Sequence, residues 1–77
     1  MKVRILTPEW NKSFEAEAVF LPGELGEFEV LEGHAPIIST LVPGDVKWRS
    51  GAENGTQAVK GGIVSVGRGE MQICVEV

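Results

Sequence analysis

The sequence has little of what catalysis and metal binding usually require. Its 77 residues include one histidine, one cysteine and no tyrosine, whereas acid–base and nucleophilic catalysis need such groups to converge in a pocket. The single cysteine, Cys74, can form no disulfide within the chain and supplies too few ligands for a cysteine-based zinc site. We therefore expect no catalytic residue, no metal and no cofactor, and a reducing compartment fits best.

Positive charge is also scarce. Lysine and arginine number 7 against 11 aspartates and glutamates, giving a net charge of −4 and a pI near 4.8. Nucleic-acid binding requires clustered lysine and arginine that neutralise phosphates. An oligonucleotide-binding barrel is possible on strand count but lacks a basic groove with interleaved aromatics. We expect no nucleic-acid partner.

Long apolar runs are missing too. No segment approaches the ~20 residues that span a bilayer, and the first residues, Met1 to Pro8, lack the apolar core of a signal peptide. We expect a chain that is neither inserted in a membrane nor exported. The glycosylation patterns at 11–13 and 54–56 are accordingly interpreted as turns.

What the sequence does have is period-two alternation of apolar and polar residues. Hydrophobic residues make up 43% of the chain, enough for a packed core. Met71, Ile73, Val75 and Val77 alternate with polar neighbours and Cys74, which predicts a strand with one buried face. The run 14–20 predicts another strand, in which Phe14, Ala16, Ala18 and Phe20 face away from Glu15, Glu17 and Val19. The run 46–49 alternates in the same way, with Val46 and Trp48 on one face and Lys47 and Arg49 on the other.

Shorter strands and tight turns complete this pattern. The strands are predicted at Val3–Leu6, Glu27–Leu31, Ile37–Leu41, Thr56–Lys60 and Ile63–Val66, with turns at Pro22-Gly23, Pro43-Gly44, Asn54-Gly55 and Gly67-Arg68-Gly69. No linker or repeat interrupts them. The fold class is therefore all-β, a flattened antiparallel β-sandwich or barrel of about ten short strands forming one domain over residues 1–77.

Several single features suggest chemistry but favour simpler interpretations. Cys74 and His34 could pair as nucleophile and base, yet Cys74 lies on a predicted strand without a third partner. Gly61-Gly62 is followed by no Gly-Lys-Ser/Thr, so it predicts a strand-end turn or bulge rather than a phosphate loop. Lys60 lacks the acidic neighbour of a lipoyl-attachment lysine. Residues 24–32 carry four glutamates, which favour a solvated acidic edge over a metal site.

An ordered set of motifs resembles one known family. These are Leu21-Pro22-Gly23, Gly26-Glu27-Phe28, the run Val30 to Pro36 with Gly33-His34-Ala35-Pro36 at its end, Leu41-Val42-Pro43-Gly44 and the run Gly61 to Val66. In order and spacing they resemble the epsilon subunit of F-type ATP synthase, across essentially the whole chain. The resemblance implies a non-catalytic rotor subunit of the central stalk, built as a sandwich of two five-stranded sheets.

The resemblance also implies partners and contact residues. It implies binding to the gamma subunit and to the c-ring, at the cytoplasmic face of the energy-coupling membrane, the bacterial inner membrane in the first instance. Residues Gly26, Glu27, Phe28 and Glu29 are then expected to contact the c-ring, and Thr7, His34 and Ser39 the gamma subunit. Basic c-ring loops would complement the acidic residues, which sets register more than affinity.

The sequence departs from the family pattern in places. Glu29 stands where glycine is usual and Glu32 where proline is common. The chain ends at Val77, where a helical hairpin that inhibits ATP hydrolysis, and in some bacteria binds ATP, normally follows. We therefore expect no nucleotide binding by these residues. The alternative to a rotor part is an independent β-sandwich that binds a peptide or small ligand. An enzyme is disfavoured because so few residues suit catalysis, an argument that does not cover a site shared across an oligomer.

Overall fold

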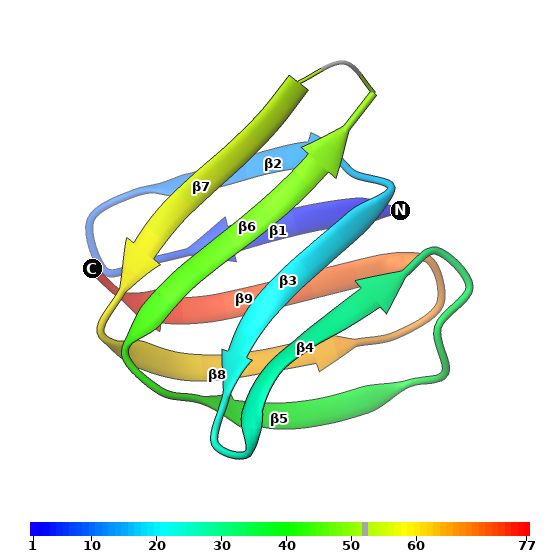
Figure 1. Ribbon diagram of the computed structural model, residues 1–77. Coiled ribbons are helices and arrows are strands. Elements are labelled where there is room, and N and C mark those ends of the chain that lie inside the picture. Colours follow the sequence, from blue (N-terminus) through cyan, green and yellow to red (C-terminus); the bar gives the residue numbers. More distant parts are fainter. Residues whose placement is uncertain (52) are drawn as a thin grey trace.

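The computed structural model describes residues 1–51 and 53–77, and the regular secondary structure of these residues consists of β-strands, with no helix (Figure 1). The strands of the described residues are β1 (Lys2–Leu6), β2 (Asn11–Glu15), β3 (Ala18–Gly23), β4 (Gly26–Leu31), β5 (Ile37–Leu41), β6 (Gly44–Ser50), β7 (Glu53–Val59), β8 (Gly61–Val66) and β9 (Glu70–Glu76). The all-β prediction is confirmed, with nine strands in the described residues in place of about ten.

The strands form one curled sheet that folds back on itself. Its order is β2-β1-β9-β8-β5-β3-β6-β7, with β4 paired to β3 outside this path. Strands β5 and β3 share only the pairing of Leu41 with Gly23. Figure 1 accordingly shows two layers, with β3, β4, β6 and β7 crossing in front of β1, β5, β8 and β9. The layers hold five and four strands, where the resemblance implied five and five.

The sheet is not wholly antiparallel, which corrects the sequence prediction. Strands β1 and β9 run parallel, from the pairing of Lys2 with Glu70 to that of Leu6 with Cys74. Parallel neighbours need a long connection between them. Here almost the entire chain makes that connection, since these are the first and last strands. Local periodicity predicts strands but carries no information on the direction of such a distant partner.

The core lies between the two layers and is made of inward-facing aliphatic residues. The five-stranded layer contributes Val3, Ile5, Val64 and Ile73 among others, and the second layer contributes Val19, Leu21, Val30 and Val46; these eight residues are at most 1% exposed. Complete burial of such a side chain stabilises the folded state by ~1.5–3 kcal/mol. The core therefore depends on inward positions from both layers.

Strand β9 shows the predicted alternation. Met71, Ile73 and Val75 are at most 4% exposed, and Cys74 between them faces outward and is exposed. Val77 lies just beyond the end of β9 and is 42% exposed. The prediction of a buried face on this strand is confirmed for the residues within the strand, and Val77 does not belong to that face.

The single strand predicted over 14–20 is wrong. Strand β2 ends at Glu15 and β3 begins at Ala18, and the chain passes from one layer to the other between them. The Ala16 N–H still donates to the Met1 carbonyl in the first layer, at 2.9 Å, whereas the Glu17 N–H donates to the Arg49 carbonyl in the second, at 2.8 Å. This corner changes which residues face inward, so Val19, expected outside, is completely buried.

The turn predicted at Asn54-Gly55 is also wrong, because both residues lie within β7. They pair with Arg49 and Trp48 of β6. Gly55 lies against the Trp48 ring so closely that a Cβ at position 55 would overlap it. This glycine is therefore required by an aromatic ring on the neighbouring strand rather than by a turn.

The other predicted turns fit in part. Pro22 and Gly23 end β3, and the reversal itself falls at Glu24 and Leu25, while 67–69 connect β8 to β9. Gly61 and Gly62, predicted as a strand-end turn or bulge, begin β8 and pair with Glu76 and Val75. Gly62 has a φ of 153° and approaches the Cys74 carbonyl so closely that a Cβ there would overlap it. Close approach of two backbones explains the glycine.

Candidate binding surfaces

The residues predicted to contact the c-ring lie at the start of β4, beside the β3–β4 turn. Glu27 and Glu29 face outward and are exposed, while Phe28 between them is half-buried and packs against the core. The four positions from Gly26 to Glu29 thus belong to a strand, where the resemblance implied a loop. Alternation on this strand presents both carboxylates on one face.

Glu27 has an ion-pair partner within the molecule. Its Oε2 lies 3.6 Å from Nζ of Lys47 on β6, and the two side chains are 51% and 52% exposed. Strand β3 lies between them, paired with both β4 and β6. Such an exposed pair contributes only ~0.2–1 kcal/mol, so Glu27 can exchange this partner for another cation at small cost.

Ser39 lies close to these residues. A hollow of about 510 Å³ is lined by the residues of the β3–β4 turn, by Gly26, Glu27 and Phe28, and by Ile38, Ser39 and Thr40 of β5. The structure therefore brings Ser39, predicted to contact gamma, together with the residues predicted to contact the c-ring. Local sequence patterns do not indicate this proximity, since about ten residues of chain separate Ser39 from Glu29.

Thr7 lies elsewhere and its hydroxyl is engaged in a local turn. The Oγ1 donates to the Trp10 carbonyl at 2.9 Å and accepts from the N–H groups of Glu9, at 3.2 Å, and Trp10, at 3.0 Å. A threonine hydroxyl commonly closes a turn in this way. These bonds give Thr7 a structural role at the β1–β2 connection that is independent of any partner.

His34 is exposed in the connection between β4 and β5. Its Nδ1 lies 2.6 Å from the carbonyl of Ala35, a geometry in which the ring N–H donates to that oxygen. His34 and Glu70, the first residue of β9, line the same small hollow, whereas Cys74 is four residues further along that strand. At ~3.3 Å per residue Cys74 lies ~13 Å from Glu70, and Cys74 does not line the hollow, so the structure does not bring His34 and Cys74 together as a base and nucleophile.

The largest exposed apolar side chains gather around β5. Leu25 at the β3–β4 turn is 105% exposed, Ile38 on β5 is 79% exposed and Ile63 on β8 is 53% exposed. Leu25 and Ile38 line the same hollow, and the β5–β8 register makes Ile38 and Ile63 diagonal neighbours on one face. We call Leu25, Ile38 and Ile63 the apolar strip. Apolar side chains grouped on a surface mark interaction sites.

Sequence reasoning missed the apolar strip, although a signal for it was present. In Ile37-Ile38 and Ile63-Val64 two bulky apolar residues are adjacent. On a strand, adjacent side chains point to opposite faces. One member of each pair therefore had to face outward, unless both faces of the sheet were covered.

Neither a metal site nor a membrane span is found in the part of the chain that the structure describes. Residues 1–51 and 53–77 contain no group of three or more His, Cys, Asp or Glu side chains placed to hold a metal ion. Over the same residues, no helix is present that is long and apolar enough to cross a bilayer. What remains are surfaces: an acidic strand edge and an adjoining apolar strip.

These features define the class of the chain as a small all-β sandwich domain that exposes an apolar strip and an acidic strand edge. Within that class, the family described as ATP synthase, Delta/Epsilon chain, beta-sandwich domain matches residues 1–77. The chain belongs to this family.

Curated relatives agree with this assignment. The chain is 40% identical over 78 residues to the ATP synthase epsilon chain of Gloeothece citriformis, covering 97% of this chain and 55% of the relative. It is 35% identical over 77 residues to ATP synthase epsilon chain 2 of Syntrophotalea carbinolica, covering 99% and 56%. The chain thus spans about half the length of the curated relatives it matches.

Solved structures show the same fold. A chain of the mitochondrial ATP synthase central stalk and c-ring of Tetrahymena thermophila superposes with a TM-score of 0.85 at 19% identity, over 99% of this chain and 63% of that one. A chain of the Euglena gracilis mitochondrial ATP synthase gives 0.87 at 22% identity, over 95% and 48%. At these identities the likeness supports the fold alone.

Proposed function

We propose that this chain is a non-catalytic rotor part of a proton-translocating F-type ATP synthase, which couples the gamma subunit to the c-ring during ATP synthesis. The family match over residues 1–77 carries this proposal. The relatives named above are epsilon chains, and their name supplies the role that we transfer. Proton flow and ATP chemistry would then belong to other subunits.

The two surfaces suit two partners. We assign the exposed glutamates of β4, Glu27 and Glu29, to the c-ring, because carboxylates complement basic loops. We assign the apolar strip to gamma. Burying an isoleucine completely contributes ~1.5–3 kcal/mol, against ~0.2–1 kcal/mol for an exposed ion pair. Affinity should therefore come chiefly from the apolar strip, and register from the carboxylates.

Ser39, His34 and Thr7 complete the proposed contacts with gamma. Ser39 neighbours Ile38 and lines the hollow beside the c-ring residues, a position from which it could contact gamma near the ring. His34 is exposed and available to gamma. Thr7 could offer only its methyl group and backbone, since its hydroxyl is engaged in the turn.

The proposal includes a location. A rotor part of this kind is peripheral, at the cytoplasmic face of the energy-coupling membrane, and in bacteria this is the inner membrane. Its attachment would be through gamma and the c-ring together, so that two weak surfaces act as one strong one.

Co-purification tests the proposal. A tagged chain expressed in its source cell should bring down gamma and the c-ring after detergent extraction of the membranes. The alternative, an independent module for a peptide or small ligand, predicts recovery of the chain without either subunit. Recovery of the free chain from cells whose ATP synthase is otherwise intact would refute the rotor assignment.

A further inference from the structure

The outer face of the five-stranded layer carries a short row of apolar side chains. Cys74 of β9 pairs with Leu6 of β1 on one side and with Ile63 of β8 on the other. Alternation on these strands turns all three outward: Leu6 is half-buried, and Cys74 and Ile63 are exposed. We call these residues the apolar row. It extends from Ile63, which belongs to the apolar strip, across the layer to β1.

A hollow of about 580 Å³ adjoins the apolar row. It is lined by the three residues of the row and also by Gly61, Gly62 and Glu76, so it lies beside the last residues of β9. The two glycines have no side chain to fill it. A partner that fits this face therefore needs side chains that enter the hollow.

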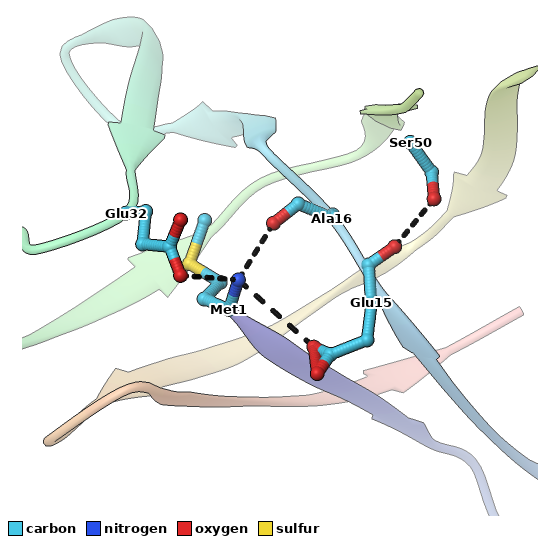
Figure 2. A network of polar contacts seen from close by, with 5 residues as sticks. All are labelled: Met1, Glu15, Ala16, Glu32 and Ser50. Atoms are coloured by element: carbon cyan, nitrogen blue, oxygen red, sulfur yellow. Dashed lines mark hydrogen bonds and ion pairs between the residues drawn. The ribbon is translucent and has the colours of Figure 1, made fainter. Parts of the chain in front are cut away.

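The opposite end of the layer is bound to the rest of the molecule. Figure 2 shows the Ser50 hydroxyl, which donates to the Glu15 carbonyl at 2.6 Å. Glu15 ends β2 in the five-stranded layer, and Ser50 ends β6 in the other layer. This bond serves the fold, and the surface available to a partner is at the other end, with the apolar row and the hollow.

Opposite charges lie on the two sides of the apolar row. Arg4 precedes Leu6 by two residues on β1, and Glu76 follows Cys74 by two residues on β9. Because β1 and β9 run parallel, the two charges lie on opposite sides of the row, each ~7 Å from it. They are too far apart to pair with each other, and the ion pairs among residues 1–51 and 53–77 involve neither of them. Both charges are therefore available to a partner.

We propose that this face binds a second copy of the chain, related to the first by a two-fold axis that runs along the apolar row. Rotation about this axis exchanges the two sides of the row, so Arg4 of each copy approaches Glu76 of the other, one strand spacing (~4.8 Å) aside. Gln72, the β9 partner of Arg4, then enters the hollow of the other copy, and Cys74 meets its own counterpart at the axis. The charge pattern is self-complementary, as a two-fold interface requires.

The size of the face sets the strength of the pairing. The two larger dimensions of the domain are 26 and 24 Å, so one broad face covers about 600 Å², less than the ~800 Å² per partner of a standard interface. We therefore expect a weak dimer, with a Kd of ~1–100 µM. Because Ile63 also belongs to the surface assigned to gamma, the dimer is a form of the unassembled chain, and it does not depend on the proposed function.

Sedimentation of the 77-residue chain over a range of concentrations tests the pairing. The mass should rise from monomer to dimer, and labelling of Cys74 by N-ethylmaleimide should slow as the dimer forms, because the thiol lies at the axis. A chain that stays monomeric up to about 1 mM, ten times the weakest expected Kd, would overturn the proposal. Shielding of Cys74 only when gamma is added would do the same, since gamma would then be the occupant of this face.

Charge variants identify the contact. Arg4→Glu and Glu76→Arg each bring like charges together twice in the dimer, and each should weaken it by about tenfold or more. An equal mixture of the two variants should dimerise again, because every such contact in a mixed pair joins opposite charges. Glu53→Arg, at an exposed position of the other layer, is the matched control and should dimerise normally. A mixture that stays monomeric would contradict the proposed axis.

The protein from its source cell gives an independent test. At high concentration a short bis-maleimide should join two copies through Cys74, since packed sheets lie ~10 Å apart, and mass spectrometry should find the cross-linked peptide. A monomeric protein whose Cys74 reacts slowly at every concentration would rule the dimer out, because another segment of the same chain would then cover the face.

Discussion

The curled sheet is closed differently on its two sides. On one side, the backbone seam, β3 and β5 are joined by the pairing of Gly23 with Leu41. On the other side, the aromatic seam, β2 and β7 are the two ends of the strand order. There Phe14 of β2 meets Trp48 of β6, with ring centroids 4.6 Å apart and planes at 32°.

This difference separates stability from binding. At the aromatic seam large apolar rings are packed against the core, and Lys12 Nζ lies 5.8 and 5.4 Å from the Phe14 and Trp48 centroids. Such rings stabilise the closed sandwich. At the backbone seam the main chain makes the closure, and Leu25 and Ile38 are left exposed. One side uses its side chains for the fold, and on the other side the exposed side chains are available to gamma, the partner that we propose.

The largest expected effect is at the aromatic seam. Trp48→Ala should lower the free energy of unfolding by ~3 kcal/mol. This value is at the lower end of the range for truncating a large aromatic residue to alanine, because Trp48 is only half-buried. Urea unfolding followed by circular dichroism measures this. Trp48→Phe, which keeps a ring against Phe14, should lose clearly less, and gamma capture by the folded fraction should be unchanged. Equal losses for both variants would remove the role of the ring.

The next effect is at the backbone seam and concerns binding. Ile38→Asp should weaken binding to gamma by about tenfold or more, since burial of this side chain is worth ~1.5–3 kcal/mol. Its free energy of unfolding should hardly change, because Ile38 is 79% exposed. Calorimetric titration of gamma measures the affinity. Leu31→Asp, 48% exposed at the end of β4, is the control that should still bind.

A smaller effect is expected under the Trp48 ring. Gly55→Ala should cost about 1 kcal/mol of folding stability, at the low end for overpacking, because the partly exposed ring can shift. Gly67→Ala is a suitable control, since no atom lies within 4 Å of a Cβ placed there. Thermal unfolding compares the two. A loss at position 67 as large as at 55 would contradict the assigned overlap.

The smallest effect is expected at the carboxylates. Glu27→Lys should weaken docking to c-ring-containing membranes by less than ~1 kcal/mol, and more at low salt than at high salt. Sedimentation with the membranes at several salt concentrations measures it. Glu17→Lys, which reverses the glutamate paired with Arg49 at 3.6 Å, is the matched control. Docking that is unchanged at every salt concentration would remove support for Glu27.

Sequence reasoning succeeded where neighbouring residues carry the information. The alternation of Met71, Ile73 and Val75 depends only on the strand itself, and their burial follows it. It failed at 14–20, where the corner depends on acceptors at Met1 and Arg49, distant in sequence. It failed at Gly55 for the same reason, because a ring on β6 and not a turn requires the glycine.

The surfaces were less predictable than the fold. The resemblance indicated the acidic residues of β4 and also Ser39, but their proximity across the hollow depends on the folding back of the sheet. Only part of the apolar strip could be inferred from the sequence. Adjacent apolar pairs show that one side chain faces outward, whereas the meeting of Leu25 with Ile38 requires the β3–β4 turn to lie beside β5.

The parallel pairing of β1 and β9 has a mechanical consequence. Because the two strands run in the same direction, from Lys2 beside Glu70 to Leu6 beside Cys74, a force pulling the beginning of β1 away from the end of β9 slides one strand along the other. The hydrogen bonds between β1 and β9 then bear the force simultaneously, in shear, and do not break one after another. The domain should resist stretching through its ends better than its small core suggests.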